Sequence, residues 1–324
     1  MSQAGQLNAL YKVAYAKGVE DLIPKTGKLA ELIPFVPSEL QNGKQYEQPV
    51  VLTAEAGFTY SLDTQDAYNL NESIGMNMES AVVPGADIVL DSTVGYNQAA
   101  RASHSQTSFK SAMSAKFENM LKSSEKRLEI AMLYGNDSIA SVSVQSVATT
   151  DPLAIVIDQK TWATGIFAGS ENSLVVFSRT SNGAVVDSLN PFKISRVDID
   201  ARTIYLTVPA GATSSLANLE AAVEAYETKV HFFSSVTNNS GTIAYAEMAG
   251  LKKIITNTGS LFGISAAQYD LWKGNSVQTT GQLTMSKVLS AVSRAVQRGL
   301  DTDATVMVNP STWADLASNL AALS

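Results

Sequence analysis

The residues best suited to chemistry in this chain are two histidines, His104 and His231. Neither belongs to an H-x-x-x-H pair or has a cluster of metal ligands beside it in sequence, so we expect no metal site. A Ser-His-Asp triad would need one of them as its base, and no G-x-S-x-G elbow accompanies them. The phosphate-binding patterns G-x-x-x-x-G-K-[ST] and G-x-G-x-x-G do not occur in the sequence either. We therefore expect each imidazole to be exposed, or buried with a hydrogen-bond partner.

Two pairs of aspartates are the remaining candidates for catalysis or metal binding. Asp198 and Asp200 would share one face of a strand, as the two carboxylates of a glycosidase can. Their position beside a tight turn favours a role in the turn or at a sheet edge. Asp301 and Asp303 begin like a calcium loop but lack its glycine and its distal glutamate. We therefore predict that the protein is not an enzyme and uses no cofactor or metal.

The composition points to a folded protein with surface reserved for permanent contacts. The 324 residues are 45% hydrophobic, and only 16% are charged, against about 25% in an average domain. The net charge of −7 disfavours a general nucleic-acid binder, which needs a basic stripe. Cysteine is absent from the sequence, which excludes disulfides and thiolate chemistry. No run of about 18 apolar residues and no secretory signal occur, so we expect synthesis in a cytoplasm and no membrane partner.

Residues 46–107 have the character of a long, acidic, extended arm. No lysine lies between Gln45 and Phe109, and eight acids face Arg101 as the one fixed positive charge. The β-branched and aromatic runs predict a long β-hairpin with strands at 49–53, 58–62 and 81–96 and a tip at 69–79. An arm with so few apolar residues cannot bury its own faces, so we expect it to lie on a neighbouring subunit. The apolar side chains predicted at the tip are Ile74, Met76 and Met78.

A single long amphipathic helix is predicted at 108–135, with Ser108 as its N-cap and Gly135 as its stop. Apolar residues recur there at intervals of three and four, which defines one face of a helix. The members of this face are Phe109, Met113, Phe117, Met120, Leu121, Leu128 and Met132.

The remaining segments predict an α+β protein. Residues 1–45 contain three prolines and read as an extended arm that docks on another subunit, with a disordered tail as the alternative. Residues 151–240 read as an inserted β-rich subdomain, and 241–324 as an α+β core. In that core we expect strands at 252–256 and 305–308, the latter buried, a helix at 284–298, and a last helix from Thr312.

This order of segments resembles the major capsid protein of tailed double-stranded DNA phages, which has the Hong Kong 97-type fold. The resemblance spans essentially the whole chain, although the phrases that carry it are not a strict motif. They are GKQYEQPVVLTAEAGFTYSL at 43–62, RLEIAMLYG at 127–135, KKIITNTGSLFGISAAQYDLWKGN at 252–275 and VMVNPSTWADL at 306–316.

The resemblance implies a role for each segment. Residues 1–45 would be the N-arm, 46–107 the E-loop, and 108–150 the spine helix and the start of the P-domain. The inserted β subdomain at 151–240 would be followed by the P-domain and A-domain at 241–324. Relatives usually continue beyond the point that corresponds to Ser324, so either the C-terminal part would be incomplete or the A-domain would lie elsewhere in the chain. Some members cross-link an E-loop lysine to a neighbour's asparagine, which this lysine-free loop cannot do.

The implied function is structural. Copies would assemble as hexamers and pentamers into an icosahedral head in the host cytoplasm, around packaged DNA bound without sequence specificity. Scaffold, portal and cement proteins are the further partners that the resemblance suggests. An encapsulin-like compartment of the same fold is the nearest alternative, followed by a β-rich surface or adhesion protein. The expected contacts between subunits are apolar at Ile74, Met76 and Met78, and ionic between Glu72 or Glu79 and Lys110, Lys116, Lys122 or Arg127.

Overall fold

The computed structural model describes residues 29–33, 45–60, 70–93, 106–148, 150–277, 281, 283–303 and 305–323. His104 lies outside the described residues. The chain divides into two compact units. The first comprises Met1–Ser38 and Gly85–Lys253, and the second comprises Glu39–Pro84 and Ile254–Ser324.

The first unit is built around a six-stranded antiparallel sheet with the strand order β3-β8-β5-β6-β7-β4. The central strand β5 is rich in valine and phenylalanine because both of its faces are covered, whereas β6 and β7 alternate buried with more exposed residues. Phe177 and Phe192 meet edge to face at a centroid distance of 6.0 Å, and both are fully buried. The strands are β3 (Ala140–Val142), β4 (Leu153–Val156), β5 (Leu174–Arg179), β6 (Phe192–Asp198), β7 (Thr203–Thr207) and β8 (Thr228–Phe232).

Helices complete the core of this unit. Leu219 and Val223 of α6 (Leu216–Ala225) are fully buried in the same apolar cluster as the sheet. The Ser215 hydroxyl accepts a hydrogen bond from the Asn218 amide and so caps α6. Short elements fill the connections, namely α5 (Thr164–Phe167), η2 (Asp187–Leu189), η3 (Phe233–Ser235), the hairpin of β9 (Val236–Asn239) and β10 (Thr242–Tyr245), and α7 (Leu251–Ile255).

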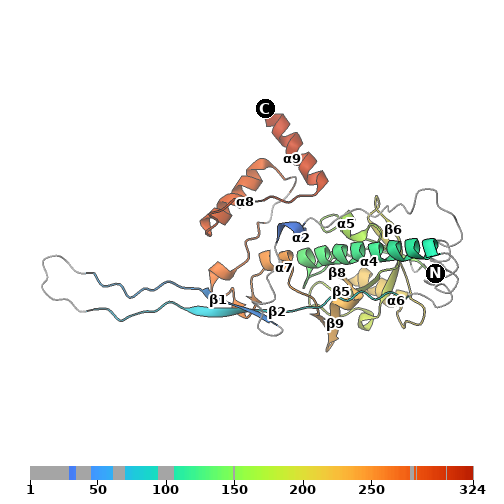
Figure 1. Ribbon diagram of the computed structural model, residues 1–324, viewed down its shortest axis with the longest axis horizontal. Coiled ribbons are helices and arrows are strands. Elements are labelled where there is room, and N and C mark those ends of the chain that lie inside the picture. The colour runs from blue at the N-terminus through green and yellow to red at the C-terminus, as the bar shows by residue number, and fades with distance from the viewer. Residues whose placement is uncertain are drawn as a thin grey trace. The chain divides into compact units, whose positions relative to one another are not determined.

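The long helix α4 (Gln106–Tyr134) runs alongside the sheet (Figure 1). Its 29 residues make a rod of about 43 Å. Ile130 packs into the core, whereas the side chains of Phe117 and Leu121 are 58% and 65% exposed. The apolar face predicted from sequence is therefore left uncovered at these two positions. The helix begins two residues before the predicted cap, Ser108, and ends where it was predicted to end.

A short helix, α2 (Leu29–Leu32), packs on α4. The Leu29 amide donates one bifurcated hydrogen bond to the two carboxylate oxygens of the buried Glu129, at 2.9 and 3.1 Å. Leu29 itself is only 1% exposed. These residues therefore pack on their own chain, whereas the sequence predicted that the segment 1–45 docks on another subunit.

The second unit contains a long hairpin and a helical part. Strand β1 (Gln45–Val51) pairs with β2 (Met78–Pro84) in an antiparallel register that matches Gln45 with Pro84 and Val51 with Met78. A small β-hairpin and a 3-10 turn support its base, and two helices follow. These elements are β11 (Ser260–Leu261), β12 (Ile264–Ser265), η4 (Asp270–Trp272), α8 (Met285–Gln297) and α9 (Pro310–Leu323).

Two strands predicted from sequence in the C-terminal region are wrong. Residues 252–256 lie largely in the helix α7, and residues 305–308 are exposed and form no strand. Both runs are short, and hydrophobic periodicity over four or five residues does not decide between strand, helix and loop. The helix predicted at 284–298 is confirmed, with the Thr284 hydroxyl as its cap.

Candidate interaction surface

The two legs of the hairpin stay together well beyond the paired strands (Figure 1). The Leu52 amide donates to the Asn77 carbonyl at 2.8 Å, and the Ala56 amide donates to the Ile74 carbonyl at 3.1 Å. Further out, the Asn71 amide donates to the Thr59 hydroxyl at 2.8 Å. We call the described parts of this structure, residues 45–60 and 70–84, the hairpin arm. The predicted extended hairpin is confirmed in this part.

The position of the tip differs from the prediction. Residues 70–79, which the sequence assigned to the tip, belong to the returning leg, and Met78 and Glu79 already pair with Val51 and Val50. The second strand is β2, and no strand follows Pro84 within the described residues up to 93. The predicted tip at 69–79 is therefore wrong for residues 70–79.

Apolar side chains on the hairpin arm remain in solvent. The exposed fractions are 57% for Ile74, 49% for Met76 and 47% for Met78. These residues are two apart in an extended leg, which places them on one side of it. The opposite leg adds Val51, Phe58 and Tyr60, all more than half exposed. A row of exposed apolar residues of this kind marks a contact surface.

The base of the hairpin arm is anchored within its own unit. Leu52, Ala81, Ile264 and Tyr269 form a small buried cluster. The Val82 amide donates to the Phe262 carbonyl at 2.9 Å, which joins β2 to the small hairpin. The arm is therefore held firmly at its base, while its outer legs are held mainly by each other.

Tyr269 ties the returning leg to this cluster. Its hydroxyl accepts a hydrogen bond from Asn77 Nδ2 at 2.5 Å and donates one to the Glu79 carboxylate. Loss of solvent raises the pKa of Tyr269, and the Glu79 charge adds to this rise, so the hydroxyl stays protonated.

We expect Tyr269→Phe to loosen the base of the hairpin arm. Losing these hydrogen bonds should cost about 1 kcal/mol, which corresponds to about fivefold faster exchange of the Val82 amide proton in hydrogen-exchange measurements. Tyr46→Phe is the matched control, because the Tyr46 hydroxyl bonds only to the exposed Gln48 side chain. Equal exchange in both variants would show that apolar contacts alone hold the base.

The acidic and basic residues predicted to form ion pairs between subunits differ in their local contacts. Within the described residues, no acid at 45–60 or 70–93 forms an ion pair. Lys116 Nζ donates to the Thr93 carbonyl at 2.5 Å, and the Lys110 side chain lies outside the described residues. Lys122 and Arg127 line a pocket beside α4, and the Arg127 guanidinium stacks on Phe232 at 3.4 Å from the ring centre. Whether these cations meet a neighbour's acids stays a prediction.

His231 is not an accessible base. It is 1% exposed in β8, and its Nε2 lies 2.9 Å from the Ser178 hydroxyl, which is fully buried as well. Burial, with the charge of Lys229 second, lowers the pKa of His231 to about 4. A hydroxyl and an imidazole sealed inside the sheet cannot reach a substrate.

An NMR titration of the imidazole should therefore give a pKa near 4 for His231, well below the ordinary value of about 6.5. Between these two values the folded state binds fewer protons than the unfolded state. This group alone consequently makes the free energy of unfolding rise with pH across that window. A titration midpoint near 6.5 would mean that the site is open to water.

The aspartate pairs have local roles or none. Asp198 Oδ1 accepts a hydrogen bond from the Ala201 amide, and Oδ2 lies 3.4 Å from Arg196 Nη2, so this carboxylate shapes the turn between β6 and β7. Asp200, Asp301 and Asp303 are exposed. Among the described residues, no three histidines or carboxylates gather in a way that could hold a metal ion.

Searches of protein-family models, of curated proteins and of solved structures gave no match to this chain. The class that the structure itself defines is a mixed α+β protein with a six-stranded antiparallel sheet and several helices. Within the described residues, no helix is both long and apolar enough to cross a membrane.

Proposed function

We propose that this protein is the structural subunit of a closed shell built from many copies of the same chain. The observation that carries the proposal is the hairpin arm, which is anchored at its base and leaves Ile74, Met76 and Met78 about half exposed along one leg. Its carboxylates also have no ion-pair partner within the described residues. Such an arm gains both apolar and ionic contacts by lying on a second copy.

The finer assignment in this proposal is a Hong Kong 97-like phage capsid protein. Three features support it, namely the extended hairpin ahead of the long helix, the 29-residue helix α4, and the β-rich segment that follows α4 in the chain. In this assignment, hexamers and pentamers of the chain enclose double-stranded DNA.

The energetics suit collective assembly. Covering the exposed half of one methionine or isoleucine contributes about 1 kcal/mol, and an exposed ion pair contributes about 0–1 kcal/mol. One arm therefore stabilises a pairwise contact only modestly. Each subunit of a closed shell makes several such contacts at once, and this multivalency stabilises the whole.

Negative-stain microscopy of the purified chain tests the proposal directly. Shells, tubes or rings of subunits are expected, and a monomer at high protein concentration would refute it. The content of isolated particles then distinguishes between the two functions that such a shell could have. Nucleic acid inside supports a capsid, whereas protein cargo supports an encapsulin-like compartment.

The arm should supply no amine for a covalent cross-link between subunits. No lysine lies between Gln45 and Phe109, so the arm cannot supply the amine of an amide cross-link. Particles boiled in SDS should therefore run as a single 34.4 kDa band. A ladder of covalent multimers would show that another part of the chain supplies the bond.

A further inference from the structure

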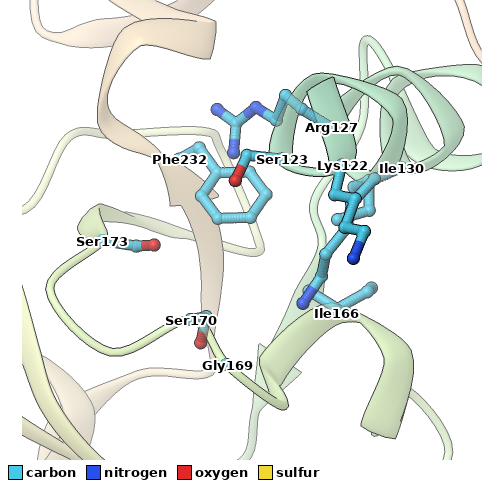
Figure 2. A pocket seen from close by; sticks show the side chains of 10 residues that line it. Lys122, Ser123, Arg127, Ile130, Ile166, Gly169, Ser170, Ser173 and Phe232 are labelled. Carbon is cyan, nitrogen blue, oxygen red and sulfur yellow. The ribbon is translucent and has the colours of Figure 1, made fainter. Parts of the chain in front are cut away.

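A pocket of about 140 Å³ lies in the first unit between α4 and the loop that follows α5. Figure 2 shows Lys122, Ser123 and Arg127 reaching it from α4, with Ser170 and Ser173 on the opposite wall. Phe232 and Ile166 supply an apolar floor. The loop turns through Gly169 and Asn172, both with φ of 71°, so its shape is fixed by the backbone.

Arg127 is oriented but lacks an acceptor. Stacking on Phe232 occupies one face of the guanidinium and leaves its in-plane N–H donors at the pocket. Within the described residues, these donors make no hydrogen bond to the protein. Burial lowers the pKa of Arg127 to about 10, and the nearby Glu247 opposes this change only in part. A half-buried guanidinium in this state is well placed to receive an oxyanion.

Lys126 adds a second cation at the same pocket. Its ammonium donates to the Ala168 carbonyl at 2.5 Å, which places it against the loop. Burial lowers the pKa of Lys126, and the Glu171 charge opposes this shift. An anion bound beside this ammonium would favour its charged form.

We propose that this pocket binds a single phosphate group, as inorganic phosphate or as the end of a small phosphomonoester. Three cations line it, and two acids, Glu171 and Glu247, lie close enough to interact with them. Cations that line a pocket suit a group that carries about −1.5 to −2 at neutral pH. On the loop wall the Ser173 hydroxyl faces the pocket, whereas the Ser170 hydroxyl already donates to the Phe167 carbonyl at 2.7 Å. Donors on α4 and at Ser173 match the tetrahedral oxygens of phosphate better than the planar pair of a carboxylate.

A nucleic-acid backbone fits the pocket less well. A polyanion needs a stripe of cations along its length, whereas this chain carries a net charge of −7 and the pocket is small and isolated. The site therefore selects one phosphate rather than a run of them. This inference does not depend on the proposed shell.

Isothermal titration of the full chain at constant ionic strength tests the proposal, with inorganic phosphate, glycerol 3-phosphate, glutamate and a short DNA duplex as separate probes. Saturable binding of a phosphate probe is expected. Arg127→Lys and Lys122→Gln should each weaken it about tenfold, because each removes a charged or bidentate contact. Lys160→Gln is the control, since this exposed lysine lies away from the pocket and the substitution changes charge equally.

The titrations with phosphate and with glycerol 3-phosphate distinguish the free ion from a monoester. The probe that binds more tightly identifies which of the two the pocket takes. Non-saturable binding, or equal binding by all variants, would overturn the proposal. The proposal would also be overturned if glutamate or DNA displaced the bound phosphate probe at concentrations as low as those at which phosphate displaces it. Far-ultraviolet circular dichroism of each variant confirms that it is folded, and Lys122→Gln keeps the test decisive if Arg127→Lys unfolds.

Discussion

Replacing Ile74, Met76 and Met78 together with serine should abolish particle formation and leave the subunit folded. Each side chain is about half exposed, so its loss costs the isolated subunit little. On a neighbouring copy, the three together contribute about 3 kcal/mol to each arm contact, or a factor of about 150 in its association constant. Light scattering and negative-stain microscopy measure the loss of particles, and urea unfolding measures the stability of the subunit.

A matched triple variant controls for the general effect of adding serine. Val144, Ile199 and Leu271 are exposed to 54%, 46% and 74% and lie off the hairpin arm. Their replacement with serine should leave assembly unchanged. If the arm variant formed particles in normal yield, the arm would not be part of the interface between subunits. The main support for a shell would then be lost.

The second large effect is expected at Gly135, where Gly135→Ala should destabilise the first unit by about 3 kcal/mol. A Cβ atom there would collide with the backbone carbonyl oxygens of Ala131 and Met248. The Gly250 amide also donates to the Gly135 carbonyl at 2.8 Å, so the two backbones cannot separate freely. Overpacking against fixed backbone reaches the upper end of the usual range of 1–3 kcal/mol, about 3 kcal/mol here.

Urea-unfolding curves give this free energy directly. Gly259→Ala serves as the control, because a Cβ there meets nothing within 4 Å and the backbone φ is not in the left-handed region. A loss below about 0.5 kcal/mol at Gly135 would mean that the loop carrying Met248 moves away at little cost.

The elements with long, regular patterns were predictable from sequence. The helices near 108–135 and 284–298 are confirmed close to their predicted bounds. Gly135 does follow the last residue of α4, but for a reason the sequence could not show. The residue is required by the close approach of the segment around Gly250 and not by a positive φ.

The pairing partners of short segments were not predictable in the same way. The register of the hairpin depends on which residues face each other, and the sequence pattern assigned to the tip residues that the structure places in the returning leg. The anchor at Tyr269 lies 192 residues from Asn77, and no local signal connects the two.

The pocket shows the same limit. Lys122 and Arg127 were identified as basic residues on a helix, which describes their charge but not their surroundings. Phe232 and the loop at 168–173 are far from these two residues in sequence, and the folding of the sheet brings them close. Lys126 and Ser173 carried no sequence signal that could have marked them as lining a site.

Anchorage at the base alone makes the hairpin arm a lever whose pivot is the Leu52–Tyr269 cluster. From Leu52 to Tyr60 an extended leg reaches at most about 27 Å, so a tilt of about 10° at the pivot swings its outer end by about 5 Å. A small adjustment at one buried cluster would thus let identical chains reach neighbours set at different angles. A closed curved shell made of one kind of subunit requires such a variable angle, because its five-fold and six-fold rings bend by different amounts.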